Sequence, residues 1–142
     1  MSNQSIELDQ RLYEYLLAHS LREPPILERL RADTAGLEMA NMQIAPEQGQ
    51  FMALIARMVN ARSYIEVGTF TGYSALVMAL AMGKDAEIYA LDISVEWTAI
   101  AQRYWKEAGV DDRIRLMLAA ADESLSHLEA SRAGQIDIMF ID

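Results

Sequence analysis

The pattern of hydrophobic and polar positions divides the chain near residue 61. Before that point, apolar residues recur every three or four positions, which is typical of helices with one apolar face. The first such face consists of Leu8, Leu12, Tyr15, Leu16 and His19. Pro24 and Pro25 cannot continue this helix, so we expect a break there and a second helix that ends near Gly36.

A third helix is expected from Pro46, because proline is favoured at the first helical position. Its apolar stripe consists of Phe51, Leu54, Ile55 and Met58. Gly49 lies inside this helix, where glycine costs about 1 kcal/mol relative to alanine. We therefore expect close packing or the approach of a ligand at Gly49.

After Arg62 the pattern changes to short apolar strands that alternate with helices. The expected strands and helices are residues 63–68, 72–83, 86–92, 94–109, 113–119, 122–131 and 135–142, beginning with a strand. This order predicts an α/β fold, with a parallel sheet flanked by helices on both faces and N-terminal helices before it. We expect a single domain over residues 1–142, with a helical segment over 1–61 and a βαβ half over 62–142.

Composition excludes several classes of protein. The chain has 142 residues, a formal net charge of −9 and no cysteine, so disulfides and thiolate metal sites are excluded. The acidity argues against nucleic acid as a partner. The N-terminus has neither the basic nor the apolar region of a signal peptide, and the apolar run over residues 73–82 is too short to span a bilayer. We therefore expect a cytoplasmic protein with no membrane partner.

Four features with possible chemistry fall at the carboxyl ends of the expected strands, where open α/β sheets bind ligands: residues 68–72, Asp92, residues 119–122 and Asp142. The first is a G-x-x-x-G turn rather than the dinucleotide pattern G-x-G-x-x-G, because Phe70 stands where a second glycine would admit a pyrophosphate. Two alternatives need no ligand: a tightly packed strand-to-helix turn at residues 68–72, and a helix capped by Asp122 at residues 119–122.

Two carboxylates favour a ligand without phosphate. Glu66 lies at the end of the first expected strand, where it could receive an ammonium group or turn amides, or form a salt bridge within the protein. Asp92, 20 positions after Gly72, could accept both hydroxyls of a ribose. Free N–H groups at the helix start near Gly72 could bind a carboxylate. A ligand that has an adenosine, an amino group and a carboxylate but no phosphate matches these features, and S-adenosylmethionine is such a ligand.

Several segments together extend this interpretation to a family. They are NMQIAPEQGQF, YIEVGTFTGYSALVMALAM, YALDIS, AGVDDRIRLMLAAADESL and IDIMFID. In these segments the chain, from about Leu12 to Asp142, resembles the cation-dependent class I O-methyltransferases, the group of caffeoyl-CoA and catechol O-methyltransferases. The resemblance implies a Rossmann-like methyltransferase fold, of which this chain has only the first four strands. It also implies S-adenosylmethionine as cofactor and a small hydroxylated aromatic substrate, typically a catechol.

The resemblance implies a role for each matching residue. The cofactor-binding residues would be Ile44, Glu66, Gly68, Thr69 and Ser74 at the methionine half, Asp92 at the ribose, and Ile93 and Ala121 at the adenine. Asp142 would be the catalytic residue, as the first carboxylate ligand of a divalent metal, usually magnesium, that lowers the pKa of the acceptor hydroxyl. The two histidines are expected to be surface or packing residues, and the two tryptophans to pack on their shared helix or at an interface.

The chain also departs from the family. Ala119-Ala120-Ala121 replaces a common Gly-Pro-Ala, and the relatives continue past the fourth strand with further metal ligands. We therefore expect a fragment or truncated chain, with the segment IDIMFI as an exposed apolar edge that favours a homodimer. Two alternatives stay open: a non-catalytic cofactor-binding or self-associating module, and an NAD-dependent oxidoreductase, against which Phe70 argues.

Overall fold

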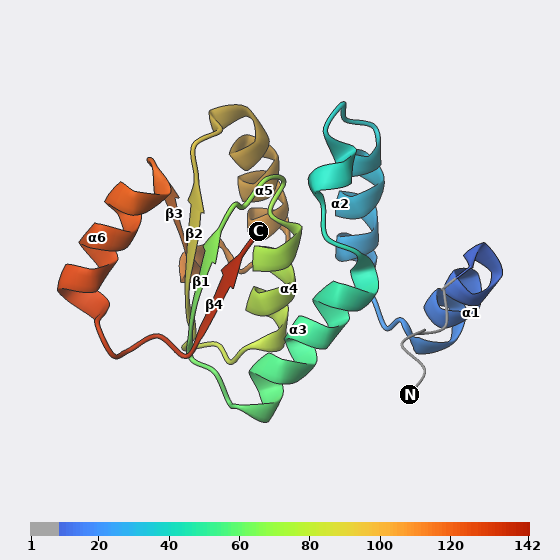
Figure 1. Ribbon diagram of the computed structural model, residues 1–142, viewed down its shortest axis with the longest axis horizontal. Helices are drawn as coiled ribbons and strands as arrows, with labels where there is room; N and C mark the ends of the chain where they lie inside the picture. Colours follow the sequence, from blue (N-terminus) through green and yellow to red (C-terminus); the bar gives the residue numbers. More distant parts are fainter. Residues whose placement is uncertain (1–8) are drawn as a thin grey trace, which may run out of the picture.

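The strands and helices after residue 61 form one parallel sheet with helices on both faces (Figure 1). The computed structural model describes residues 9–142 of the chain. The strands lie in the order β3-β2-β1-β4, and every neighbouring pair is parallel. These elements are β1 (Ser63–Val67), α4 (Tyr73–Ala81), β2 (Glu87–Asp92), α5 (Val95–Glu107), η2 (Asp111–Arg113), β3 (Ile114–Leu118), α6 (Ala121–Arg132) and β4 (Ile138–Ile141). The predicted α/β fold with four strands is confirmed.

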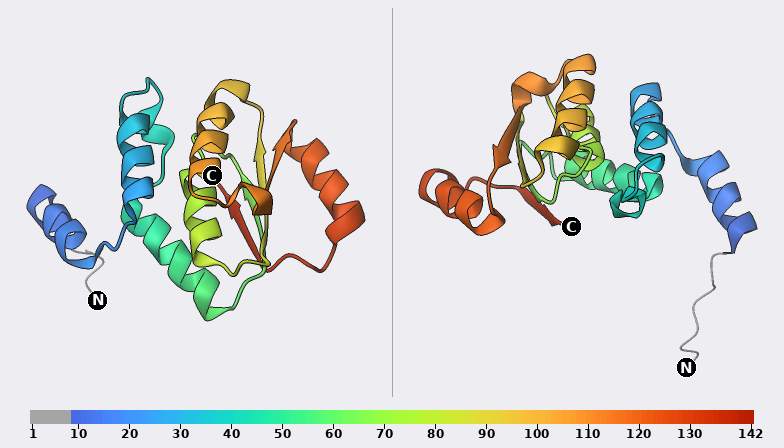
Figure 2. Two further views of the ribbon diagram at one scale, coloured as in Figure 1. Left: turned by 180° about the vertical axis from the view of Figure 1, so that it is seen from behind. Right: turned by 90° about the horizontal axis from the view of Figure 1, so that it is seen from above.

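Alternate residues of the central strands point to opposite faces of the sheet, as the pleat requires. Tyr64 belongs to the large hydrophobic core that includes α4 and α5. Ile65 and Tyr89 belong to a smaller core with Leu128 of α6, and Figure 2 shows α6 on the opposite side of the strands from α4 and α5. Residues 73–79 of α4 are all buried, because the sheet covers one side of α4 and the N-terminal helices cover the other.

The N-terminal part of the described chain is helical, as the sequence predicts. Its elements are α1 (Gln10–Ser20), α2 (Pro25–Ala35), η1 (Ala40–Met42) and α3 (Pro46–Met58). Gly36 forms the C-cap of α2, and Pro46 is the first residue of α3. A Cβ atom on Gly49 would lie 3.1 Å from Cε1 of Tyr73 and 3.3 Å from Cγ2 of Val77. The expected close packing at Gly49 is therefore confirmed, and it brings α3 against α4.

The apolar faces of α1 and α3 are not buried, contrary to the usual meaning of such stripes. Leu12 and Tyr15 of α1 are 43% and 63% exposed, and Leu8 lies outside the described residues. The exposed apolar residues of α3 are Phe51, Leu54, Ile55, Met58 and its neighbour Val59. The reason is that α3 contacts α4 through its small residues, Gly49 and Ala56, so its large apolar side chains point away.

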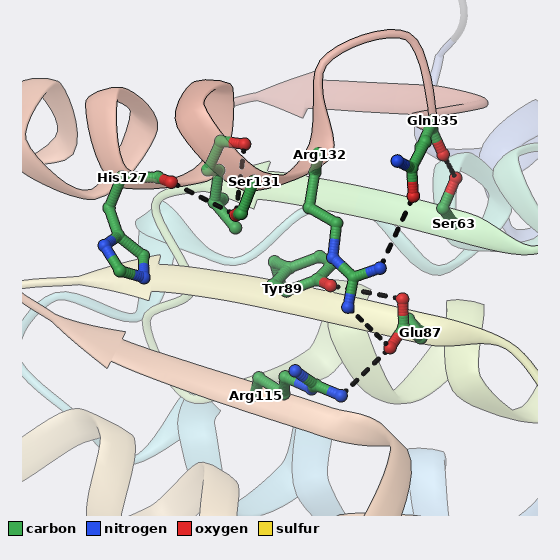
Figure 3. Close-up of polar contacts among 9 residues, drawn as sticks. Ser63, Glu87, Tyr89, Arg115, His127, Ser131, Arg132 and Gln135 are labelled. Atoms are coloured by element: carbon green, nitrogen blue, oxygen red, sulfur yellow. Dashed lines mark hydrogen bonds and ion pairs between the residues drawn. The ribbon is translucent and has the colours of Figure 1, made fainter.

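A cluster of charged and aromatic side chains attaches the end of α6 to the sheet (Figure 3). Glu87, the first residue of β2, accepts hydrogen bonds from Arg115 of β3 at 2.9 Å and Arg132 of α6 at 3.1 Å. The two guanidinium groups lie 5.7 and 5.9 Å from the ring centroid of Tyr89, within the range of cation–π attraction. Glu87 therefore links three elements and gives both arginines a carboxylate partner.

β4 forms one edge of the sheet, and its outer side chains are exposed, as the sequence predicts. Met139 and Ile141 are 48% and 70% exposed in the described structure. Ile138 and Phe140 point the other way and pack against the large core. None of the helices in residues 9–142 combines the length and the apolar character that crossing a membrane would require.

Candidate functional site

The turn between β1 and α4 contains three residues in the left-handed region of backbone conformation. Gly68, Phe70 and Gly72 have φ angles of +90°, +50° and +82°. A Cβ atom on Gly72 would lie 2.5 Å from Cβ of Ala101 in α5. Glycine is therefore required at position 72 for two reasons, its backbone conformation and its contact with α5. Phe70 adopts a conformation that is uncommon for a bulky residue, so its surroundings must hold it there.

Asp92 supplies part of that support. Its Oδ2 atom accepts hydrogen bonds from the backbone N–H groups of Thr69 at 2.9 Å and Phe70 at 2.8 Å. Its Oδ1 atom accepts a hydrogen bond from the backbone N–H of Ser94 at 2.7 Å. The sequence predicts Asp92 at the edge of the sheet, but not its bonds to the turn. The carboxylate is thus fixed by three donors and orders the turn before any ligand is bound.

Two tryptophans of α5 also contact the turn. The indole Nε1 of Trp105, a fully buried residue, donates a hydrogen bond to the carbonyl of Gly72 at 3.2 Å. The ring of Trp97 meets the ring of Phe70 edge-on, with centroids 4.9 Å apart. The sequence predicts only that these residues pack on their helix or at an interface. Their contact with the turn could not be predicted, because it depends on the angle at which α5 crosses α4.

Glu66 of β1 is fully buried directly before the turn, with no exposed surface. Its Oε2 atom accepts a hydrogen bond from the Tyr64 hydroxyl at 3.1 Å, whereas Oε1 has no partner in the described part of the chain. Burial raises the pKa of the Glu66 carboxyl to about 7, although the hydroxyls of Ser74, Thr69 and Tyr64 act in the opposite direction.

The alternative of a salt bridge for Glu66 within the protein is therefore wrong for residues 9–142, because no cationic side chain there pairs with it. A buried carboxylate without a cation is costly. An unpaired carboxylate oxygen at this depth is complementary to a donor group of a ligand, and best to a cationic one.

Most of the predicted site residues line two adjoining hollows beside the turn. One is lined by Met42, Gln43, Ile44, Thr69, Phe70, Thr71, Tyr73, Ser74 and Asp142. The other, of about 160 Å³, is lined by Met42, Gly68, Phe70, Asp92 and Asp142. Glu66 lies buried next to the turn rather than on either wall. The sequence singled out neither Met42 nor Gln43, because a short helix such as η1 leaves no periodic signal.

The remaining predicted residues lie outside these hollows but at the same edge of the sheet. Ile93 follows β2 and is 77% exposed. Ala121 begins α6, and Ala120 is its N-cap, with no side chain capping the helix. The alternative that Asp122 caps α6 is wrong, because Asp122 lies inside the first turn and its Oδ1 accepts from its neighbour Glu123 at 2.9 Å. The backbone N–H groups of Ala121 and Asp122, at the start of α6, therefore have no acceptor among the described residues.

Asp142 lies beside the glycine turn. Its backbone N–H donates to the carbonyl of Val67 at 3.0 Å, and its carbonyl oxygen lies 3.2 Å from where a Cβ of Gly68 would be. Desolvation raises the pKa of its side-chain carboxyl. Within residues 9–142 there is no group of three or more histidine, cysteine or acidic residues that could hold a metal ion. The described residues alone therefore do not fit a magnesium site, which needs near-octahedral oxygen ligands.

The two histidines are exposed helix residues, in agreement with the expectation that they are surface or packing residues. His19 stacks on Tyr15 of α1, with ring centroids 3.9 Å apart. His127 lies on α6 and is exposed (Figure 3). Neither lines the two hollows at the turn.

A family model described as O-methyltransferase matches residues 17–142. The chain belongs to the O-methyltransferase family. The mouse protein named catechol O-methyltransferase domain-containing protein 1 is 36% identical over 135 residues, covering 94% of this chain and 52% of that protein. A caffeoyl-CoA O-methyltransferase from Eucalyptus gunnii is 34% identical over 145 residues, covering 100% of this chain and 58% of that enzyme. The chain thus spans between half and two thirds of the length of these relatives.

Solved structures of methyltransferases have the same fold as this chain. The Podospora anserina methyltransferase PaMTH1, solved with bound SAH, superposes with a TM-score of 0.85 at 28% identity over 98% of this chain and 61% of that one. An O-methyltransferase from Bacillus cereus, in complex with SAH, gives a TM-score of 0.79 at 26% identity over 91% of this chain and 59% of that one. The predicted Rossmann-like methyltransferase fold is confirmed.

Proposed function

We propose that the chain binds S-adenosylmethionine at the glycine turn and forms the cofactor-binding part of an O-methyltransferase. The observation that carries this proposal is the buried Glu66 carboxylate, whose Oε1 atom has no partner among the described residues. The amino group of the cofactor would give this carboxylate a cationic donor. A nearby acid at the end of β2, Asp92, and a turn without room for a pyrophosphate agree with a phosphate-free adenosyl ligand.

Each site residue has a proposed role in this complex. The residues at the methionine half of the cofactor would be Ile44, Glu66, Gly68, Thr69 and Ser74. Asp92 would accept hydrogen bonds from the ribose hydroxyls, and its three backbone donors would keep it in place while it does so. Ile93 would pack on the adenine, and Ala121, at the uncapped start of α6, would lie at the adenine edge.

We further propose that the methyl group goes to a hydroxyl of a small, catechol-type acceptor. The names of the mouse and Eucalyptus relatives support a small hydroxylated substrate. The cofactor supplies an activated methyl group on sulfonium. The residues of this chain would hold the cofactor in one orientation next to the hollow of about 160 Å³ that Gly68 and Asp92 help to line. An acceptor hydroxyl could approach the cofactor there.

Metal assistance is a separate proposal, in which Asp142 would supply one carboxylate ligand to a divalent ion such as magnesium. The described residues do not complete such a site, so no catalytic step of this chain is derived through a metal. We also propose a homodimer, for which the exposed apolar residues of β4 and α3 are the support. A single domain over residues 1–142 and a cytoplasmic location likewise stay proposals.

Calorimetric titration of the purified 142-residue chain with S-adenosylhomocysteine tests the cofactor proposal. We expect saturable binding to the wild-type chain and none to Asp92→Ala. A folded wild-type chain that does not bind would contradict the proposal. NADH in the same calorimeter tests the oxidoreductase alternative, and binding of NADH alone would favour it. Methyl transfer to catechol by this chain with added magnesium would exclude a purely non-catalytic module.

A further inference from the structure

A chain of buried hydrogen bonds connects α2 to the glycine turn. Thr34, in the last turn of α2, and Thr71, in the glycine turn, are each 1% exposed, and their Oγ1 atoms lie 2.8 Å apart. The Thr34 hydroxyl also donates to the carbonyl of Leu30 at 2.8 Å. At the other end, Nε2 of Gln43 donates to Oγ1 of Thr71 at 3.5 Å. These bonds join residues that are 37 and 28 positions apart in the sequence.

The donor and acceptor of each hydrogen bond in this series follow from counting the hydroxyl protons. Each threonine hydroxyl has a single proton to donate. Thr34 gives its proton to the Leu30 carbonyl, so Thr71 must donate to Thr34 and accept from Gln43. The donors therefore run in one direction, from Gln43 through Thr71 and Thr34 to Leu30. Hydrogen bonds aligned in this way polarise one another in a low-dielectric interior.

Thr71 is the part of the turn that these bonds hold. Asp92 binds the N–H groups of Thr69 and Phe70, and Trp105 binds the carbonyl of Gly72, so Thr71 lies between two other fixed points. Because Phe70 has a φ of +50°, the turn keeps its shape only while its neighbours are constrained. Without Thr34, the Thr71 proton would be buried without an acceptor, and the turn would relax to satisfy it.

We propose that Thr34 is a positioning residue for the cofactor turn, acting through Thr71, so that cofactor affinity depends on the last turn of α2. This inference rests on the proposed function of the turn. Thr34 does not line the hollows at the turn, whereas Gln43 and Thr71 line one of them. Thr34 therefore reaches the ligand site through the Thr71 hydroxyl rather than by direct contact. In the free protein, the hydrogen bond between Thr34 and Thr71 keeps the turn in the conformation that binds the cofactor.

Isosteric substitution separates this role from packing. We expect Thr34→Val to raise the Kd for S-adenosylhomocysteine about tenfold in calorimetry, and Thr34→Ser, which keeps the hydroxyl, to restore it to within about twofold of wild type. Thr98→Val is the matched control. Thr98 is also 1% exposed and donates to a carbonyl of its own helix, that of Ser94 at 2.6 Å, but makes no bond to the turn. Its Kd should equal that of wild type.

The double variant and the wild type give independent tests. Thr34→Val combined with Thr71→Val should bind no more weakly than Thr71→Val alone, because the two residues act through one bond. By reciprocal linkage, ligand binding must stabilise α2 in the wild type. Hydrogen exchange over residues 30–36 should therefore slow when S-adenosylhomocysteine is added, which tests the proposal even if a variant does not fold.

Each outcome of these measurements decides between two explanations. A Thr34→Val variant with a lower melting temperature and an unchanged Kd would show that Thr34 only packs, and would overturn the proposal. Unchanged exchange over residues 30–36 in a ligand-saturated wild type would do the same. If the wild-type chain binds no S-adenosylhomocysteine at all, the proposed function fails rather than the role of Thr34.

Discussion

Replacing Glu66 by glutamine should stabilise the free protein and weaken its binding of cofactor. The substitution keeps the shape of the side chain and its ability to accept from the Tyr64 hydroxyl, which lies 3.1 Å from Oε2. It removes a negative charge that is fully buried and has no cationic partner in residues 9–142. The two effects have opposite signs because the charge is costly without ligand and useful with it.

The size of the stability change follows from the pKa of Glu66. Burial raises this pKa from its ordinary value of 4.5 to about 7. Between these values the folded protein holds a proton that the unfolded chain has released, so the free energy of unfolding decreases as the pH rises. The contribution of protonated Glu66 to the free energy of unfolding is fully present below about pH 4.5 and is lost as the pH rises through 7. At 1.36 kcal/mol per pH unit, the loss at pH 8 is about 3 kcal/mol.

Urea denaturation at pH 5 and pH 8 measures this difference. We expect Glu66→Gln to exceed wild type in unfolding free energy by about 2 to 3 kcal/mol more at pH 8 than at pH 5, because a small part of the loss has already occurred at pH 5. Glu129→Gln, at an exposed carboxylate of α6, serves as the control and should show no such change. Calorimetry at pH 8 should show S-adenosylhomocysteine binding weakened about 10- to 100-fold, the range for a hydrogen bond to a charged group.

Two results would refute this reasoning. A difference between variant and wild type that is the same at both pH values would mean that Glu66 is not a buried anion at pH 8. An unchanged affinity for S-adenosylhomocysteine would mean that its carboxylate does not meet the cationic end of the ligand. The two results are independent, since one concerns the free protein and the other the complex.

Three further substitutions and one control test the turn and the sheet. Gly72→Ala should lower the unfolding free energy by about 2 kcal/mol or more in urea, because its Cβ would lie 2.5 Å from Cβ of Ala101. Gly83→Ala, where a Cβ would meet nothing within 4 Å, should leave stability nearly unchanged, and equal effects would contradict the steric argument. Asp92→Asn should weaken S-adenosylhomocysteine binding at least tenfold in calorimetry. The asparagine amide has only one oxygen, so it cannot accept from both the Thr69 N–H and the Ser94 N–H as the two carboxylate oxygens do. Wild-type affinity of this variant would exclude a role of Asp92 in ordering the turn. Glu87→Gln should lower the melting temperature by several degrees by leaving two arginines without a carboxylate, and an unchanged value would show that the cluster is dispensable.

Local sequence signals predicted the order of elements because their causes act within a few residues. The helix expected from residue 94 does start there, because the Ser94 hydroxyl caps it by accepting a hydrogen bond from the N–H of Trp97 at 3.2 Å. Pro46 begins α3 as predicted, and the alternation of apolar runs and turns placed all four strands. The glycine turn, Asp92 and Asp142 meet at one edge because parallel strands share their direction. Predicting that these residues lie at one edge therefore requires only the correct order of strands and helices.

Burial and side-chain partners could not be predicted in this way. The spacing of Phe51 and Met58 is typical of a buried face, yet α3 buries its small residues instead, a choice made by the shape of α4. Glu66 could have formed a salt bridge or been solvated, and only the packed structure shows that it is buried with no cationic partner among residues 9–142. The bond between Thr34 and Thr71 joins two ordinary residues whose spacing in the sequence carries no signal.

The contacts of α5 with the turn have a practical consequence. The chain contains two tryptophans, and both touch the turn: Trp105 through the carbonyl of Gly72 and Trp97 through the ring of Phe70. All tryptophan fluorescence of the protein therefore originates beside the turn. Its intensity and wavelength report the environment of that one segment, so the native chain carries its own optical label at the place where a ligand would arrive.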